Sequence, residues 1–194
     1  MATNSLQELY VEQLQDLYSA EQQIIKALPK MIEAAQSDEL RDALNEHLEV
    51  TKTQAQRLEK ICQELGEDHK NEKCKGMEGV LQEGSDLVKE VKNEEVRDAA
   101  IIAAAQRVEH YEMAGYGTAR TYATLLGYDE AASVLEQTLE EEKEADVTLS
   151  NLAEDINVEA LQGEGESTGT AESTRGLAKS SKTAKAVGKN KRGA

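Results

Sequence analysis

Four long stretches of the sequence carry apolar residues at helical spacing, and they come as two pairs separated by a longer connection. The stretches cover residues 6–35, 40–65, 101–126 and 131–152. Only residues 37–39 separate the first two stretches, and so short a connection makes consecutive helices antiparallel neighbours. The connection over residues 66–93 is much longer and holds four glycines with a short apolar set, which predicts one or two further short helices.

A helix pair, a long crossover and a second helix pair is the connectivity of ferritin-like four-helix bundles. The chain has no Phe, no Trp and only one proline, whereas an all-β fold uses aromatic and turn residues freely. That proline, Pro29, should kink the first helix or end its first part. We therefore predict an all-α, ferritin-like antiparallel four-helix bundle over residues 1–160, with a long crossover between the helix pairs and a disordered tail over residues 161–194.

The C-terminal segment differs from the rest of the chain in charge. Residues 163–194 hold seven basic and three acidic residues, so they carry +4, and the formal net charge of −16 leaves −20 on the other 162 residues. The segment has few large apolar side chains to offset the ordering entropy of ~1–2 kcal/mol per residue, which predicts disorder. Two roles stay open for it: a solubilising extension, or weak contact with an anionic partner such as nucleic acid.

The two helix pairs match each other at a constant shift of 91 residues, without a gap. Asp38 falls on Asp129 at the two short connections, and Glu21 falls on Glu112 within the first helix of each pair. Two amphipathic hairpins could match through their apolar pattern alone. The common register of connection and core nevertheless favours a true two-fold repeat.

Several acidic residues lie on the apolar faces of the predicted helices. At about 100° per residue, Glu21 lies roughly 20° from the centre of its apolar stripe, Glu112 lies within about 30°, and Glu142 lies almost at the centre. Asp146 follows Glu142 by one turn and also points inward, and Glu109 lies at the flank about one turn before Glu112. A buried carboxylate without a partner costs several kcal/mol, so these residues need a counter-charge.

No basic side chain is well placed to supply that counter-charge. Lys26 and Lys30 point almost opposite Glu21, and Arg120 could reach the core only from its rim. Metal cations are the remaining common solution. Glu21 and Glu142 lie about 16 and about 15 residues from their short connections, so the two carboxylates meet at one height in the bundle. Oxygen ligands with one imidazole suit iron or manganese better than zinc or copper.

The second helix offers two candidate donors. Counting levels from the short connection points to Glu49, but helical phase turns Glu49 almost opposite the apolar stripe. His47 has the inward phase, and we prefer it, although an inward histidine is often only a satisfied core residue. The 91-residue repeat matches His47 with Thr138 and Glu142 with Thr51, so the two halves differ at the site.

Four segments, in order, resemble the YciF-like branch of the ferritin-like superfamily. They are LYSAEQQIIKALPKM, HLEVTKTQAQRLEKI, VEHYEMAGYGTA and LEEEKEADVTLSNLA, and the resemblance spans residues 5–155. It implies a dinuclear metal motif similar to that of rubrerythrins and bacterioferritins, in stress-associated proteins of unsettled activity. The wider superfamily uses one Glu on each of the first and third helices and Glu-x-x-His on the second and fourth.

This sequence departs from that pattern. Glu21 matches the first-helix Glu, Glu112 or Glu109 matches the third-helix Glu, and Glu142 matches the fourth-helix Glu. Ala145, however, stands where the histidine of the fourth-helix motif would be, and the second helix has no Glu-x-x-His. The site that the resemblance implies is therefore asymmetric, which puts its full occupancy by two metal ions in doubt.

These observations predict a dinuclear iron or manganese site, whose chemistry would be oxidation of Fe²⁺ or consumption of peroxide or dioxygen. The alternative is a non-enzymatic stress or structural bundle with a degenerate or vacant metal site. The expected metal ligands are Glu21, His47, Glu109, Glu112, Glu142 and Asp146.

Cellular location and assembly are expectations of a coarser kind. The chain has no apolar run near the ~20 residues needed to span a bilayer, and its start lacks a secretory pattern. The two cysteines form no disulfide framework, and we expect Cys62 in the core and Cys74 exposed. We therefore expect a cytoplasmic homodimer without membrane contact.

Overall fold

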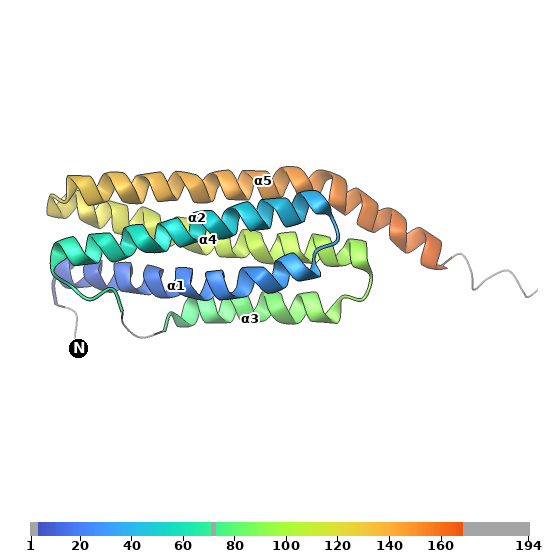
Figure 1. The fold of residues 1–194 in the computed structure, drawn as a ribbon, viewed down its shortest axis with the longest axis horizontal. Coiled ribbons are helices and arrows are strands. Elements are labelled where there is room, and N and C mark those ends of the chain that lie inside the picture. Colours follow the sequence, from blue (N-terminus) through green and yellow to red (C-terminus); the bar gives the residue numbers. More distant parts are fainter. Residues whose placement is uncertain (1–3, 71–72, 169–194) are drawn as a thin grey trace, which may run out of the picture.

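The computed structural model describes residues 4–70 and 73–168, which fold into five α-helices without a strand in that part of the chain. The helices are α1 (Leu6–Ala34), α2 (Asp38–Leu65), α3 (Lys75–Glu90), α4 (Glu94–Leu126) and α5 (Asp129–Thr168). Helices α1, α2, α4 and α5 form an antiparallel bundle, and α3 lies outside it against α1 and α4 (Figure 1). The predicted bundle with a long crossover is thus confirmed.

Local side-chain chemistry sets the helix ends. Ser5 begins α1 with a capping box, in which its hydroxyl accepts from the Glu8 amide while the Glu8 carboxylate accepts from the Ser5 amide. Ser37 caps α2 more simply, because its hydroxyl accepts a hydrogen bond from the amide of Leu40, the third residue of the helix. Gly66 and Gly127 end α2 and α4 in the left-handed conformation, with φ of 74° and 81°, which favours glycine.

The structure refines three sequence expectations. Pro29 lies inside α1, which continues to Ala34, and the crossover holds a single helix, α3. Helix α5 continues to Thr168, past residue 160, the predicted end of the bundle. The rest of the predicted tail, residues 169–194, lies outside the described residues. No helix among the described residues is long and apolar enough to cross a membrane.

The apolar core falls into two clusters along the bundle. One contains Leu14, Leu17, Leu58, Tyr116 and Leu135, and the other contains Ile24, Leu28, Leu44, Ile101 and Leu149. On each of the four bundle helices, buried or nearly buried polar residues lie between the members of the two clusters. The bundle therefore has a polar layer between two apolar cores.

Candidate metal centre

The polar layer draws acidic or imidazole side chains from all four bundle helices. Glu21 comes from α1, His47 from α2, Glu109 and Glu112 from α4, and Glu142 from α5. The four glutamates are buried, and only 11% of the His47 side chain is exposed. Each residue lies on the apolar stripe of its own helix, so the packing that buries the leucines also buries these side chains.

Four of these residues form a compact group, which we call the four-donor cluster: His47, Glu109, Glu112 and Glu142. Each offers a ligand atom, and these atoms all lie within 4.8 Å of one another. The Nε2 atom of His47 lies 3.3 Å from Oε1 of Glu109. Within the described residues, no lysine or arginine forms an ion pair with any of the four.

Many polar atoms of the layer lack a hydrogen-bond partner among the described residues. They are Oε2 of Glu21, Nε2 of His47, Oε2 of Glu109, both carboxylate oxygens of Glu112 and Oε2 of Glu142. Buried polar groups in folded proteins are nearly always hydrogen-bonded, and each exception needs a physical reason. Glu21 lies within hydrogen-bond reach of Glu112, and Glu109 of Glu142, so these oxygens could be satisfied either by a cation or by shared protons.

Burial dominates the titration of these side chains. It raises the pKa of Glu21, Glu109 and Glu112 well above the usual range, and repulsion by neighbouring carboxylates adds to the effect, while hydrogen bonds to Tyr116 and Glu112 oppose it at Glu21. Burial also raises the pKa of Glu142 to about 7 and lowers the pKa of His47 to about 4. His47 is therefore neutral near pH 7, and neutral imidazole is the form that binds metal ions.

Tyr116 is a member of the layer that the sequence argument missed. It is fully buried on α4, and its hydroxyl donates a hydrogen bond to Oε1 of Glu21. Glu112 lies beside Glu21 and contributes to its electrostatics. The signal was present in the sequence, because Tyr116 follows Glu112 by four residues and so lies on the same face of the helix.

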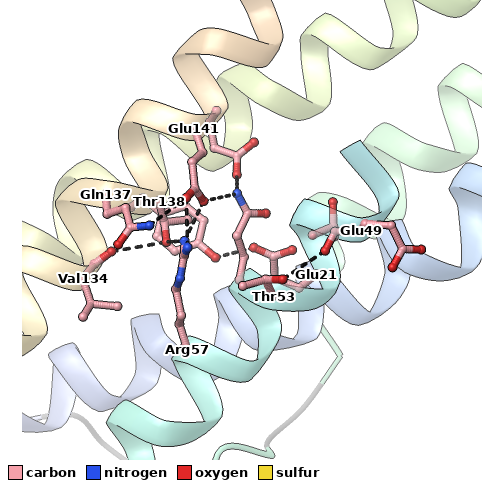
Figure 2. A network of polar contacts seen from close by, with 12 residues as sticks. Glu21, Glu49, Thr53, Arg57, Val134, Gln137, Thr138 and Glu141 are labelled. Atoms are coloured by element: carbon pink, nitrogen blue, oxygen red, sulfur yellow. Dashed lines mark hydrogen bonds and ion pairs between the residues drawn. The ribbon is translucent and has the colours of Figure 1, made fainter. Parts of the chain in front are cut away.

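One edge of the layer is closed by polar contacts between α2 and α5. Figure 2 shows Arg57 reaching from α2 to Glu141, with distances of 2.6 Å from Nη1 to Oε2 and 2.9 Å from Nη2 to Oε1. Gln54 donates hydrogen bonds from Nε2 to Glu142 Oε1 and to Glu141 Oε2. Because the Arg57 guanidinium is paired with Glu141, Glu142 keeps a neutral amide as its direct partner.

The structure brings most of the predicted ligands together. His47, Glu109, Glu112 and Glu142 form the four-donor cluster, and Glu21 lies beside Glu112. The candidate left open on α2, Glu49, is 72% exposed and pairs with Lys52, so its side chain lies outside the layer.

Asp146, like Glu21, is a predicted ligand that lies outside the four-donor cluster. Its Oδ1 atom accepts a 3.1 Å hydrogen bond from Gln106 and lies 3.4 Å from Nε2 of His110, at the edge of the α4–α5 contact. Cys74 was also placed wrongly, because it is buried at the start of α3, where its thiol accepts from the Met77 amide.

The donor set fits a hard or borderline cation. Carboxylate oxygens with one neutral imidazole are the ligands that iron and manganese take in proteins, and no thiol is present to select a softer metal. The orphaned oxygens of Glu112 and Glu142 are the atoms that a cation would satisfy. The residues therefore fit the metal that the sequence argument called for.

Known proteins resemble this chain in sequence and in fold. Residues 5–162 match the family described as Domain of unknown function, DUF892. Protein YciF of Escherichia coli K12 is 43% identical over 154 residues, which cover 79% of this chain and 93% of YciF. The crystal structure of the E. coli stress protein YciF superposes with a TM-score of 0.77 at 42% identity, covering 79% of this chain and 98% of that one.

Two further solved structures share the fold. YcfI from Rhodopseudomonas palustris has a TM-score of 0.74 at 41% identity, over 76% of this chain and 94% of that chain. A two-domain protein from Anabaena variabilis, with a ferritin-like domain, has a TM-score of 0.52 at 12% identity, over 92% of this chain and 42% of that chain. At that identity the last match concerns the fold alone. The chain therefore belongs to the YciF-like DUF892 family and has the ferritin-like bundle that its four sequence segments predicted.

Proposed function

We propose that this protein binds a dinuclear iron or manganese centre in the polar layer and uses it in oxidative chemistry, either oxidation of Fe²⁺ or consumption of dioxygen or peroxide. The observation that carries the proposal is the unpaired state of the buried carboxylates, above all Glu112, both of whose oxygens lack a protein partner. Without a cation, each ionised carboxylate would cost several kcal/mol of desolvation or would have to take up a proton.

The residues divide naturally between two metal ions. The four-donor cluster supplies three carboxylates and the neutral imidazole of His47 to one ion. Glu21 lies beside Glu112 and close to Glu142, and it would help Glu112 to hold the second ion. The second ion has fewer protein donors, in keeping with the asymmetry expected from Ala145.

The remaining residues of the layer position the ligands. Tyr116 holds Glu21 by its hydrogen bond, and Gln54 holds Glu142 by its amide. Such outer partners fix the orientation of metal-binding carboxylates. The two apolar cores close the layer above and below. A bound iron or manganese centre would supply the redox chemistry.

The relatives give the proposal its biological setting. E. coli YciF, similar over most of its length, is described as a stress protein, and oxidants and free Fe²⁺ are chemical stresses that such a centre would relieve. We therefore place the oxidative chemistry in a stress response.

The direct test is metal binding by the purified chain under anaerobic conditions. The metal-free protein is titrated with Fe²⁺ or Mn²⁺, and bound metal is counted by native mass spectrometry and elemental analysis. We expect up to two ions in the parent, a reduced count in Glu112→Gln and an unchanged count in Glu49→Gln, which makes the same chemical change on the exposed face of α2. Equal counts in Glu112→Gln and the parent would show that the ligands are wrongly assigned.

Two observations favour a second candidate, a stable bundle without metal chemistry. Ala145 replaces the fourth-helix histidine, and burial raises the pKa of the glutamates in the layer, so that they could hold protons instead of metal. A chain that stays metal-free after refolding with Fe²⁺ or Mn²⁺ would establish this alternative.

A further inference from the structure

A cavity of about 40 Å³ reaches the four-donor cluster from the side of the bundle that α3 covers. It lies among α1, α2, α3 and α4, and two of its lining residues, His47 and Glu109, belong to the cluster. The other twelve lining residues are apolar or glycine. Its lining includes the half-buried residues Ala27, Leu81 and Ala105 as well as the buried Glu109, so it joins the outer part of the bundle to the cluster.

Small residues and a close helix contact account for this space. Ala27 on α1 and Ala105 on α4 lack the side-chain volume to fill the interval beneath α3. Helix α3 packs closely at Gly84, where an added Cβ would lie 2.9 Å from Cβ of Ala104. Helix α3 thus covers the cavity, and the small side chains of Ala27 and Ala105 leave its interior unfilled.

The lining determines which molecules the cavity suits. A space of about 10–15 Å³, measured for a water-sized probe, is enough for one water, but that water needs two to four polar partners. Here the only polar side chains stand at the inner end, so a small apolar molecule is favoured over water along the rest of the cavity. Hydrogen peroxide has two hydroxyl groups to satisfy and meets the same obstacle as water.

A groove of about 190 Å³ between α2 and α5 offers the opposite chemistry. It also touches His47, but Glu46, Glu141 and Glu144 contribute to its lining, together with Ala145. Polar or cationic species would find hydrogen-bond partners there. The cluster is therefore approached by one apolar route and one acidic route.

We propose that the apolar cavity is a binding and entry site for dioxygen, which makes dioxygen rather than peroxide the oxidant that reaches the metal centre by this path. The inference rests on the proposed function for its chemistry, but the cavity itself can be tested without any metal. The site is formed by Ala27 and Ala105, with His47 and Glu109 at its inner end.

The first experiment uses xenon as an apolar probe of the metal-free protein, in pressurised crystals or by ¹²⁹Xe NMR. We expect xenon in the cavity of the parent and its loss in Ala105→Leu, whose larger side chain would fill the space. Ala103→Leu makes the same change at an exposed position of the same helix and should leave xenon binding unchanged. Ala27→Leu fills the cavity from α1 and replaces Ala105→Leu if that variant fails to fold.

The second experiment measures oxidation of the Fe²⁺-loaded protein by stopped flow, with dioxygen and with hydrogen peroxide. In Ala105→Leu we expect the rate constant with dioxygen to fall about tenfold, equivalent to ~1.4 kcal/mol of barrier, and the rate constant with peroxide to be unchanged. Bound Fe²⁺ should equal that of the parent. Ala145→Leu narrows the acidic groove instead and should leave the dioxygen rate unchanged.

The outcomes separate this inference from the proposed function. Absence of xenon from the parent cavity, or equal slowing with both oxidants, would overturn the dioxygen site whatever the metal content. So would a dioxygen rate that falls in Ala145→Leu and not in Ala105→Leu. A chain that binds xenon but neither Fe²⁺ nor Mn²⁺ would refute the proposed function and the oxidant role, and would leave only an apolar gas site.

Discussion

Replacing Glu142 by glutamine should stabilise the metal-free protein and reduce the stability that it gains from bound metal. Glu142 is buried on α5 and accepts a hydrogen bond from Gln54, which a glutamine side-chain oxygen could also accept. Burial raises the pKa of Glu142 from 4.5 to about 7. At 1.36 kcal/mol per pKa unit, ionising this side chain in the folded protein costs about 3 kcal/mol more than in the unfolded chain.

The sign of the pH dependence follows from this raised pKa. Below pH 4.5 the carboxyl group is protonated in both states and costs nothing. Between pH 4.5 and about 7 the unfolded chain releases the proton first, so the metal-free parent loses stability as the pH rises. Above pH 7 the full cost of about 3 kcal/mol is present. Glu142→Gln cannot ionise, so at pH 8 the metal-free variant should be more stable than the parent by about this amount.

Urea unfolding in EDTA at pH 5 and pH 8 measures the effect, and Glu140→Gln is the matched control. Glu140 is exposed and pairs with Lys143, so its replacement should change the free energy of unfolding by less than about 0.5 kcal/mol. With Mn²⁺ at about 100 times its Kd, the free energy of unfolding of the parent should rise by about 2.7 kcal/mol, and that of Glu142→Gln should rise by clearly less. A variant that is less stable than the parent by equal amounts at both pH values in EDTA would refute the reasoning.

Three further predictions concern helix α3, the α1–α2 connection and the C-terminal segment. Gly76→Ala should lower the free energy of unfolding by ~1–3 kcal/mol, because its Cβ would lie 2.6 Å from the Tyr111 hydroxyl. Gly79→Ala, which has open space around it, should instead raise the free energy of unfolding by ~0.5–1 kcal/mol. Urea unfolding measures both variants, and equal effects would contradict the prediction. Asp98→Ala should lower the free energy of unfolding by ~1–3 kcal/mol, because this buried carboxylate accepts hydrogen bonds from two backbone amides at the α1–α2 connection. Thermal unfolding tests this, with Asp155→Ala at an exposed position as the control. A chain ending at Thr168 should keep its circular dichroism spectrum and its Mn²⁺ stoichiometry, and loss of either would show that residues 169–194 support the bundle.

The helices and most of the site could be predicted from sequence because both obey one periodicity. Glu21, Glu112 and Glu142 lie on apolar stripes, and a helix that buries its stripe must bury them as well. Asp146 shows how far that argument reaches. It follows Glu142 by four residues, a rotation of about 40° beyond a full turn, which takes the side chain to the α4–α5 edge, where Gln106 binds it.

Contacts of the crossover could not be predicted in this way. Cys74 lies in a polar stretch that suggests exposure, yet its thiol lies 3.1 Å from Asp16 and 3.0 Å from the Tyr111 hydroxyl. The burial of Cys74 depends on where α3 docks, which is decided by partners 58 and 37 residues away. No local pattern carries that information. Asp98 was missed for the same reason, because its partners are backbone amides of a distant connection.

The division of the donors among four helices dictates the order in which the centre can be assembled. The α1–α2 hairpin supplies only Glu21 and His47, and the α4–α5 hairpin supplies Glu109, Glu112 and Glu142. Neither hairpin alone contains the four-donor cluster, so the complete donor set exists only once the two hairpins have packed together, unlike the site of a zinc finger, whose metal organises the fold. Capture of a metal ion by all four donors would therefore follow the docking of the two hairpins, and it would depend on α2, α4 and α5 together.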